Sequence, residues 1–485
     1  MRAFRNVGVA GFLFLSFACS SSAATRYVNV SNATPAAPHA SWGSAATDIQ
    51  SAINEAASGD EILVAPGVYR ITEFIEIPSS KTLTLRSTLS REAVIDAQGL
   101  CPAMSIYGAD SVVEGFTIRN GFSADYAGGI TVGPACTVRD CLVTSNRAYS
   151  GGGVYFYGSG VVEGCTIQSN VAADWAGGVL FYNHSSGRVV RCVIRDNLSS
   201  NYAGGVGWQY GGTVSNCWIL GNRAILGNGG GGHMDQGGEL VNSVVAGNSS
   251  GDRGGGIWTS GTDTDFSTVV NCTIVSNSAA NYGGGVFAAY NAKLLNSIIY
   301  HNTAPTNDNF YNHNLYSTVS NCCLTPDHGW PNITNAPAFV DAGAGDFRLA
   351  TASFCIDAGT ANGAPGNDIA GNLRPRVGKP GGLPRTDIGA YEYGFHFNDI
   401  RFTSPNTLEL RWDVQDLGRY RLDAETTGLV QPFWIEDIDV FTSPMMAPGQ
   451  FAVHTQTVAL PPPVPANADF RLRIERSTVG KRRGR

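Results

Sequence analysis

Short apolar runs, rich in β-branched residues, repeat between Tyr126 and Cys323 and are separated by Gly, Asn and Ser. In most repeats one run has the pattern Cys-x-Ile-x-x-Asn, as in Cys165–Asn170 and Cys272–Asn277. The asparagines assigned to the ends of the repeats are 24–29 residues apart: Asn120, Asn146, Asn170, Asn197, Asn222, Asn248, Asn277 and Asn302. A fixed period of this length is typical of a solenoid, a propeller or another array.

The content of each repeat selects among these architectures. Helical repeats are excluded because the repeats carry glycine clusters and lack an apolar stripe with a period of 3.6 residues. Propeller blades usually need about 40 residues or more. Two or three short strands joined by tight turns fit one coil of a β-helix, with coils stacked about 4.8 Å apart. The sequence therefore predicts an all-β fold, a right-handed parallel β-helix over residues 61–325.

Stacked coils place equivalent residues in columns, and two columns separated by two positions should share the inward face. The first column is Phe116, Cys141, Cys165, Cys192, Cys217, Ser243, Cys272, Ser297 and Cys322. The second is Ile118, Val143, Ile167, Ile194, Ile219, Val245, Ile274 and Ile299. Because serines interrupt the first column, buried unpaired thiols are favoured over a disulfide framework, and a single column cannot surround a metal ion. The pairing of Cys101, Cys136 and Cys355 stays open.

The asparagines and the glycine clusters are both interpreted as residues that form the turns at the corners of each coil. Asparagine tolerates the left-handed backbone region and bonds locally to the main chain, and stacked amides can also bond along the column. The glycine clusters, such as Gly177-Gly178, should form the other corner, where the backbone takes positive φ or packs closely.

An aromatic column precedes the glycine clusters. Its members, taken three residues before the last glycine, are Tyr126, Ser150, Trp175, Tyr202, Gly229, Arg253 and Tyr282, and Asp or Asn commonly stands one position earlier. The pattern favours aromatic packing that stiffens a corner, with Asp and Asn as turn formers. If a ligand binds, we expect a sugar to stack on Tyr126, Trp175, Tyr202 and Tyr282.

The residues that could form a catalytic site are His233, Asp235, Asp252 and Arg253, which lie in neighbouring repeats. His233 follows a glycine cluster where six other repeats carry Val or Ile, which predicts that it replaces a core residue. Polysaccharide-cleaving enzymes need clustered carboxylates and often a basic group, and the repeats are poor in both. The cluster departs from the repeat consensus, and such departures occur where a repeat has lost its pattern as well as where it has gained a function.

The N-terminal residues 1–24 have the pattern of a secretory signal peptide, with Arg2 and Arg5 before an apolar stretch and small residues near Ala24. We therefore expect an exported protein, secreted or associated with the cell surface or outer membrane, whose mature chain begins near Thr25. Residues 25–60 should form a strand and an amphipathic helix, Thr47–Ser58, with a capping box from Thr47 to Gln50. This helix would cover the exposed backbone of the first coil.

Two parts of the β-helix region carry family resemblances. The segment Glu61–Tyr69, which follows the helix and ends Pro-Gly-Val-Tyr, resembles the opening of pectate-lyase-like β-helix proteins. The combination of Gly-Gly-Val/Ile with Cys-x-Ile-x-x-Asn is similar to the repeats of polymorphic outer-membrane and autotransporter passenger proteins, although Cys here mostly replaces Phe. Both resemblances imply a β-helix on an exported protein.

Residues 326–394 carry a third resemblance. The runs Phe354–Gly359, Asp368–Pro375 and Asp387–Tyr393 resemble the choice-of-anchor Q module of exported bacterial β-helix proteins. Its aspartates Asp357, Asp368 and Asp387 suit Ca²⁺, but turn and cap roles are favoured, so no cofactor is predicted. Alternating strands then predict a β-sandwich over residues 395–476, followed by a basic tail, 477–485.

Composition narrows the functional classes. The chain has 60 glycines in 485 residues and a net charge of −7, which fits a turn-rich β protein and gives no electrostatic case for nucleic acid. No segment after the signal is long and apolar enough to span a membrane as a helix. The sequence favours a non-catalytic, adhesin-like or glycan-binding protein whose partner is an extracellular polysaccharide or a cell-surface glycan. The alternative is a polysaccharide lyase or hydrolase of the pectate-lyase-like class.

Overall fold

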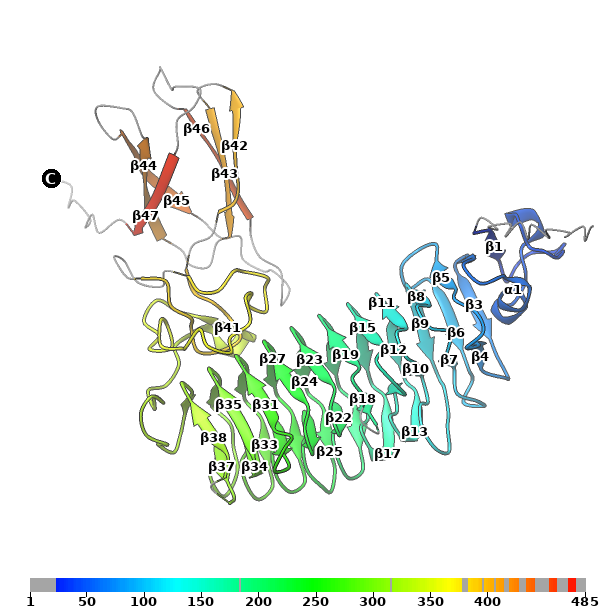
Figure 1. Cartoon of the computed structure of the whole chain (residues 1–485), viewed down its shortest axis with the longest axis horizontal. Helices are drawn as coiled ribbons and strands as arrows, with labels where there is room; N and C mark the ends of the chain where they lie inside the picture. Colours follow the sequence, from blue (N-terminus) through cyan, green and yellow to red (C-terminus); the bar gives the residue numbers. More distant parts are fainter. Residues whose placement is uncertain are drawn as a thin grey trace, which may run out of the picture.

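The computed structural model describes residues 23–182, 185–314, 316–376 and 383–394, together with the backbone of six strands between 397 and 476. From Thr25 to Leu324 the chain winds through parallel strands, and each strand pairs with its equivalents in the coils before and after it. Figure 1 shows the coils stacked into one elongated body, from the blue N-terminal end to the yellow-green coils.

Four parallel sheets form the walls of this body. Sheet A has twelve strands from β1 (Thr25–Val28) and β2 (Glu61–Val64) to β38 (Thr318–Ser320), and sheet B has eleven from β3 (Gly67–Arg70) to β39 (Cys323–Leu324). Sheet D is the six-stranded run from β13 (Arg147–Ser150) to β33 (Ser278–Ala279). The ten strands of sheet C are β4 (Ile75–Ile77), β7 (Met104–Ile106), β10 (Ile130–Val132), β14 (Val154–Phe156), β18 (Val179–Phe181), β22 (Val206–Gln209), β26 (Gly232–Asp235), β30 (Ile257–Ser260), β34 (Val286–Tyr290) and β37 (Phe310–Asn312).

The two predicted inward columns are confirmed. Ile118, Ile167, Ile194, Ile219 and Ile274 lie in one register and are fully buried in the main core. The cysteine column is also buried, but it does more than fill space. The N–H of Cys141 donates to Cys165 Sγ at 3.3 Å, the N–H of Cys165 to Cys192 Sγ at 3.3 Å, and the N–H of Cys217 to Ser243 Oγ at 3.1 Å. Serine therefore substitutes for cysteine here because both side chains accept the same main-chain bond.

The asparagine column forms a buried amide ladder, as stacked amides predicted. Asn170 Oδ1 accepts both the N–H and the Nδ2 of Asn146 at 3.0 Å, and this pattern continues through Asn302 to Asn309. Two parts of the prediction are wrong. Asn120 lies outside the ladder, because Gly121 is the residue that stands opposite Asn146. The left-handed residue is the one before each ladder asparagine, such as Ser145 and Ser169, so the asparagines themselves face inward.

The glycine clusters allow close approach between coils, as expected. A Cβ on Gly177 would meet Leu198 O at 2.4 Å, and one on Gly178 would meet Gly205 O at 2.6 Å. Any side chain would push neighbouring main chains apart at this corner.

The first coil is covered by the helix α1 (Ile49–Glu55), which buries Ile49, Ala52 and Ile53. The helix is shorter than the sequence predicted, and its N-cap is Asp48 rather than Thr47. The Asp48 carboxylate accepts the N–H of Ser51 at 2.8 Å, which satisfies one of the free amides at the helix start. Within the described residues, no helix is long and apolar enough to cross a membrane.

The docked module, residues 339–376 and 383–394, packs against the outer face of sheet B. The module includes β40 (Phe339–Asp341) and β41 (Asp346–Leu349), drawn in yellow beside the last coils (Figure 1). Its Phe347, Ile356, Ile388 and Tyr391 join one buried cluster with outward residues of the last coils. Those outward residues are Trp218, Leu220, Val244, Ala246, Val275, Ile298, Tyr300 and Cys323.

A second asparagine column, which sequence analysis missed, binds the docked module. Its members have positive φ and lie in five successive coils: Asn216, Asn242, Asn271, Asn296 and Asn321. Their Nδ2 atoms donate to main-chain carbonyls of the module, for example Asn296 to Thr360 O at 2.7 Å and Asn321 to Ala358 O at 3.2 Å. The module thus lies along the side of the β-helix.

Six strands lie within residues 395–476, where the sequence predicted a β-sandwich. They form two three-stranded antiparallel sheets. The first contains β42 (Phe397–Ser404), β43 (Thr407–Asp413) and β46 (Val453–Ala459), and the second contains β44 (Gly418–Thr426), β45 (Phe433–Val440) and β47 (Phe470–Arg476). The predicted signal peptide, apart from its last residues, and the basic tail lie outside the described residues.

Candidate functional site

The outer face of sheet C carries a column of mostly aromatic residues at the middle of its strands. Strand pairing places these residues in register: Tyr155, Leu180, Gly207, His233, Trp258, Phe287 and Tyr311. Their sequence neighbours, such as Val154 and Phe156, point into the main core. Since strand residues alternate between faces, the column points outward. There it meets the predicted aromatic column of the preceding turn, and Tyr155, Leu180 and the partly buried Trp175 share a small second core.

The N-terminal part of this surface is a group of six tyrosines, the tyrosine patch: Tyr107, Tyr126, Tyr149, Tyr155, Tyr157 and Tyr182. The ring of Tyr126 stacks on Tyr155 at 5.0 Å between centroids and lies 5.1 Å from Tyr182, and Tyr107 meets Tyr157 edge to face at 6.4 Å. Tyr155 is buried below the others, while Tyr126, Tyr149 and Tyr157 are 41%, 53% and 64% exposed. The patch is therefore a supported aromatic surface with several open rings.

Hydrogen bonding and burial hold the tyrosine patch in its neutral form. A bond to Tyr182 raises the pKa of Tyr126 to about 12, with further contributions from burial, Asp125 and Tyr149. Burial raises the pKa of Tyr155 to about 12. These phenols stay protonated at ordinary pH, so they offer hydrogen-bond donors and acceptors as well as flat faces.

The central part of the surface encloses His233. Its ring stacks on Trp258 at 4.0 Å and meets Trp175 and Tyr202 edge-on at 4.9 and 5.2 Å. Burial lowers the pKa of His233 to about 3, although a hydrogen bond to the Asn228 main chain opposes the shift. The imidazole is neutral, and among the described groups its Nδ1 has no hydrogen-bond partner.

The predicted position of His233 in the inner core is wrong. In the structure Gly232 pairs with Val206 and takes the inward position, so His233 pairs with Gly207 on the outer face. The same one-residue difference affects the aromatic column. Asn228, rather than Gly229, stands beside Tyr202, because the N–H of Ala203 donates to Asn228 O at 3.0 Å.

Among the described residues, no hydrogen bond joins the side chains of the other catalytic candidates to His233. Asp235 lies two residues further along the outer face of β26, and burial raises its pKa. Asp252 pairs with Arg253 at 3.3 Å and accepts a bond from Asn281 Nδ2 at 2.9 Å. The Arg253 guanidinium lies over the rings of Tyr282 and Phe287, 5.7 and 5.2 Å from their centroids. Asp252 and Arg253 are thus engaged with each other and with neighbouring side chains.

The four predicted ligand residues are distributed along the surface. Tyr126 belongs to the tyrosine patch, Trp175 and Tyr202 surround His233, and Tyr282 packs against Tyr311 at 5.2 Å. Trp175 and Tyr202 are 5.4 Å apart but tilted by 50°, so they do not form one flat platform. The sequence analysis overlooked the sheet C residues, although the signal was present: an aromatic residue follows the Val, Ile or Gly after several glycine clusters.

The aspartates of the docked module act in turns. Asp368 accepts the N–H groups of Ala370, Asn372 and Glu392 at 2.9, 2.7 and 3.0 Å, and Asp387 accepts that of Asp357 at 2.7 Å. Burial raises the pKa of Asp387, and it raises that of Glu392 to about 7 while the nearby Arg374 opposes the shift. Among the residues that the structure describes, no three His, Cys, Asp or Glu are grouped to hold a metal ion.

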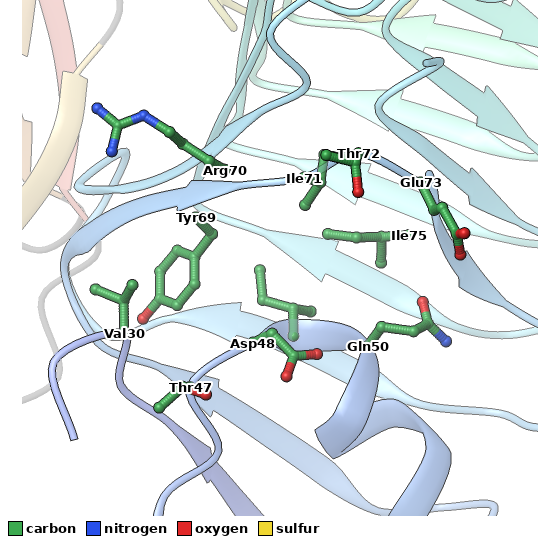
Figure 2. Close-up of a pocket in the computed structure, with 11 residues that line it drawn as sticks. Val30, Thr47, Asp48, Gln50, Tyr69, Arg70, Ile71, Thr72, Glu73 and Ile75 are labelled. Carbon is green, nitrogen blue, oxygen red and sulfur yellow. The ribbon is translucent and has the colours of Figure 1, made fainter. Parts of the chain in front are cut away.

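A small pocket lies between α1 and the first coils, apart from the residues of the aromatic surface. Figure 2 shows it lined by Val30, Tyr69, Ile71 and Ile75, with Asp48 and Gln50 from the helix. Its volume is about 250 Å³. Asp48 caps the helix, and Gln50 Oε1 accepts the N–H of Glu76 at 2.8 Å. Gln50 therefore helps to hold the helix on the first coil, whereas Asp48 stabilises the helix start.

Stacked parallel coils with three long sheets and an inner amide ladder define the molecule as a right-handed parallel β-helix protein. A family model described as "Right handed beta helix region" matches residues 102–241 and 152–324. Among solved structures, the crystal structure of pectate lyase Pel9A is similar, with a TM-score of 0.55 and 17% sequence identity over 77% of this chain and 97% of that chain. At this identity the likeness shows the fold alone. No curated protein matches the chain.

Proposed function

We propose that this is an exported or surface-displayed, non-catalytic protein that binds a glycan on the outer face of sheet C. The observation that carries the proposal is the tyrosine patch, where three rings are exposed and one of them, Tyr126, stacks on the buried ring of Tyr155. Single exposed aromatics are ordinary on protein surfaces, but a contiguous supported group is typical of a binding surface. Sugar rings present flat C–H faces and hydroxyl groups, which match aromatic faces bordered by phenols.

The arrangement favours an extended ligand. The patch draws on successive coils, from β7 to β18, and coils are spaced by about 4.8 Å. Its residues therefore spread over roughly 14 Å along the axis, a length that suits a few linked sugar units. The deeper rings around His233 and Tyr282 continue the aromatic surface toward the C-terminal coils.

Charge favours a neutral glycan. Asp125 lies close enough to Tyr126 to raise its pKa, and the whole chain has a net charge of −7. An acidic polysaccharide would be repelled by this potential unless cations screened it. We therefore expect uncharged chains to bind better than polyuronates.

The competing proposal is a polysaccharide lyase or hydrolase. It would need a proton acceptor or an acid pair at the surface. Neutral, enclosed His233 and the contacts of Asp252 with Arg253 and Asn281 favour binding over cleavage.

The test uses the full mature chain and a panel of neutral and acidic polysaccharides, assayed for binding by affinity electrophoresis and for released sugar ends. Tyr126→Ala combined with Tyr157→Ala should weaken neutral-glycan binding by about tenfold or more, because two stacking faces are lost. Tyr316→Ala is the matched control, since Tyr316 is 63% exposed but lies outside the patch.

Equal binding by the double variant and the parent would overturn the proposal. Release of sugar ends by the parent, abolished in Asp235→Asn, would instead establish the enzyme.

A further inference from the structure

Two cysteines meet where the docked module contacts the β-helix. Cys323 is the outward residue of β39, and Cys355 belongs to the module. Both are 0% exposed and lie in the same buried cluster. Their side chains are in hydrogen-bonding contact, and this contact, together with burial, raises the pKa of the Cys323 thiol. The Cys323 Sγ also donates to Asn335 O at 3.2 Å.

The approach of these two thiols differs from that in the inner cysteine column. Column residues are in-register neighbours on parallel strands, so their Cα–Cβ bonds run side by side about 4.8 Å apart. A disulfide needs Cβ atoms about 3.8 Å apart and a dihedral angle near 90°, which side-by-side bonds do not provide. Cys323 and Cys355 come from opposite sides of an interface and share one buried cluster, so their Cα–Cβ bonds are not held side by side by strand pairing.

We propose that Cys323 and Cys355 form a disulfide that fastens the docked module to the last coil of the β-helix. The disulfide can form by exchange with a small-molecule disulfide such as oxidised glutathione. In this exchange one S–S bond forms between the cysteines and the S–S bond of glutathione breaks. The two protons from the cysteine thiols end on the two glutathione thiols. This inference is independent of glycan binding.

Burial determines when the bond can form and break. Because both sulfurs are inaccessible in the docked state, the oxidant must act while the module is still undocked. Once the interface has closed, the bond is shielded from external thiols. The inner column thiols are covered by the coils themselves and already accept main-chain N–H groups, so they stay reduced.

The test is peptide mapping of the full mature chain refolded in a glutathione redox buffer and alkylated under denaturing conditions without reduction. Trypsin leaves Cys323 in residues 294–348, together with Cys322, and Cys355 in residues 349–376. The variant Cys322→Ser removes the ambiguity between the neighbouring cysteines, and serine is compatible with that column because Ser243 and Ser297 already occupy it.

The expected result is a cross-linked pair of these peptides, 2 Da lighter than their sum, with all other cysteines alkylated. The bond should survive a reductant in the native protein and disappear when the reductant is added with denaturant. Alkylation of both Cys323 and Cys355, or a cross-link between column cysteines, would overturn the proposal. Because this measurement is made on chains with an intact Cys323 and Cys355, it does not depend on the folding of a variant that lacks either one.

Discussion

At the residue scale, the amide ladder shows how one side chain can stabilise a whole coil. Asn170 is fully buried, accepts two bonds from Asn146 and donates Nδ2 to Asn197 and to Val143 O, each at 3.0 Å. A buried amide of this kind is stabilising only when every polar atom is paired.

Asn170→Ala should lower the free energy of unfolding by about 3 kcal/mol, because neighbouring buried N–H and carbonyl groups lose their partners. Urea unfolding followed by fluorescence measures the change. Asn281→Ala is the control: the exposed side chain of Asn281 donates only to the Asp252 carboxylate among the described residues, so a loss of about 0.5 kcal/mol or less is expected. Similar losses in both variants would contradict the ladder's role.

The environment of His233 makes the stability of the protein depend on pH. Its folded pKa of about 3 lies below the ordinary value of 6.5, so the unfolded chain binds the proton first as pH falls. Stability from this residue is complete above about pH 6.5 and is lost between pH 6.5 and 3.

His233→Phe should remove this loss and keep the ring packing against Trp258 and Trp175. Relative to the variant, the parent should lose about 2 kcal/mol of unfolding free energy between pH 7 and pH 5. Urea unfolding at both pH values measures the difference. A parent and variant with parallel pH profiles would show that His233 is protonated in the folded protein.

At the element scale, the outward-facing residues of sheet B change from polar to apolar along the β-helix. The outward column that contains Thr144, Gln168 and Arg195 in the early coils continues as Leu220, Ala246 and Val275. The change occurs where the docked module covers the sheet, and the second asparagine column begins in the same coil, at Asn216. Outward apolar residues are thus explained by the module that buries them.

Val275→Arg should detach the docked module, because a charge would enter an apolar interface without a partner. The expected result is faster cleavage by trypsin after Arg376, with the β-helix core left intact. Gln168→Arg places the same side chain in the same column outside the module and should leave the cleavage rate unchanged. Equal rates in Val275→Arg and the parent would show that the module is held by other contacts.

At the scale of the whole molecule, different walls of one β-helix have different roles. Sheet C carries the aromatic surface, sheet B receives the docked module, and α1 covers the first coil. The glycan surface and the module therefore do not compete for the same face. This separation allows the module to be fastened to the rod without closing the proposed binding surface.

The sequence alone determined the period, the β-helix and its inward columns, because each coil repeats the same alternation of buried and turn residues. It also identified Tyr126, Trp175, Tyr202 and Tyr282 as one turn column. The tertiary structure decided what lies beside that column, since Tyr155, Trp258 and Tyr311 come from other strands.

The register between neighbouring coils was likewise decided by the tertiary structure. Counting glycines placed His233 inside, but main-chain bonds between neighbouring coils align Gly232 with Val206 and turn His233 outward. The docking of the module beside sheet B also depended on distant contacts, such as Asn296 with Thr360. The alternation of residues within a strand determines which residues can face the core. The hydrogen bonds between coils determine how the residues of one coil align with those of the next. This alignment depends on the stacked coils together and cannot be read from any one repeat.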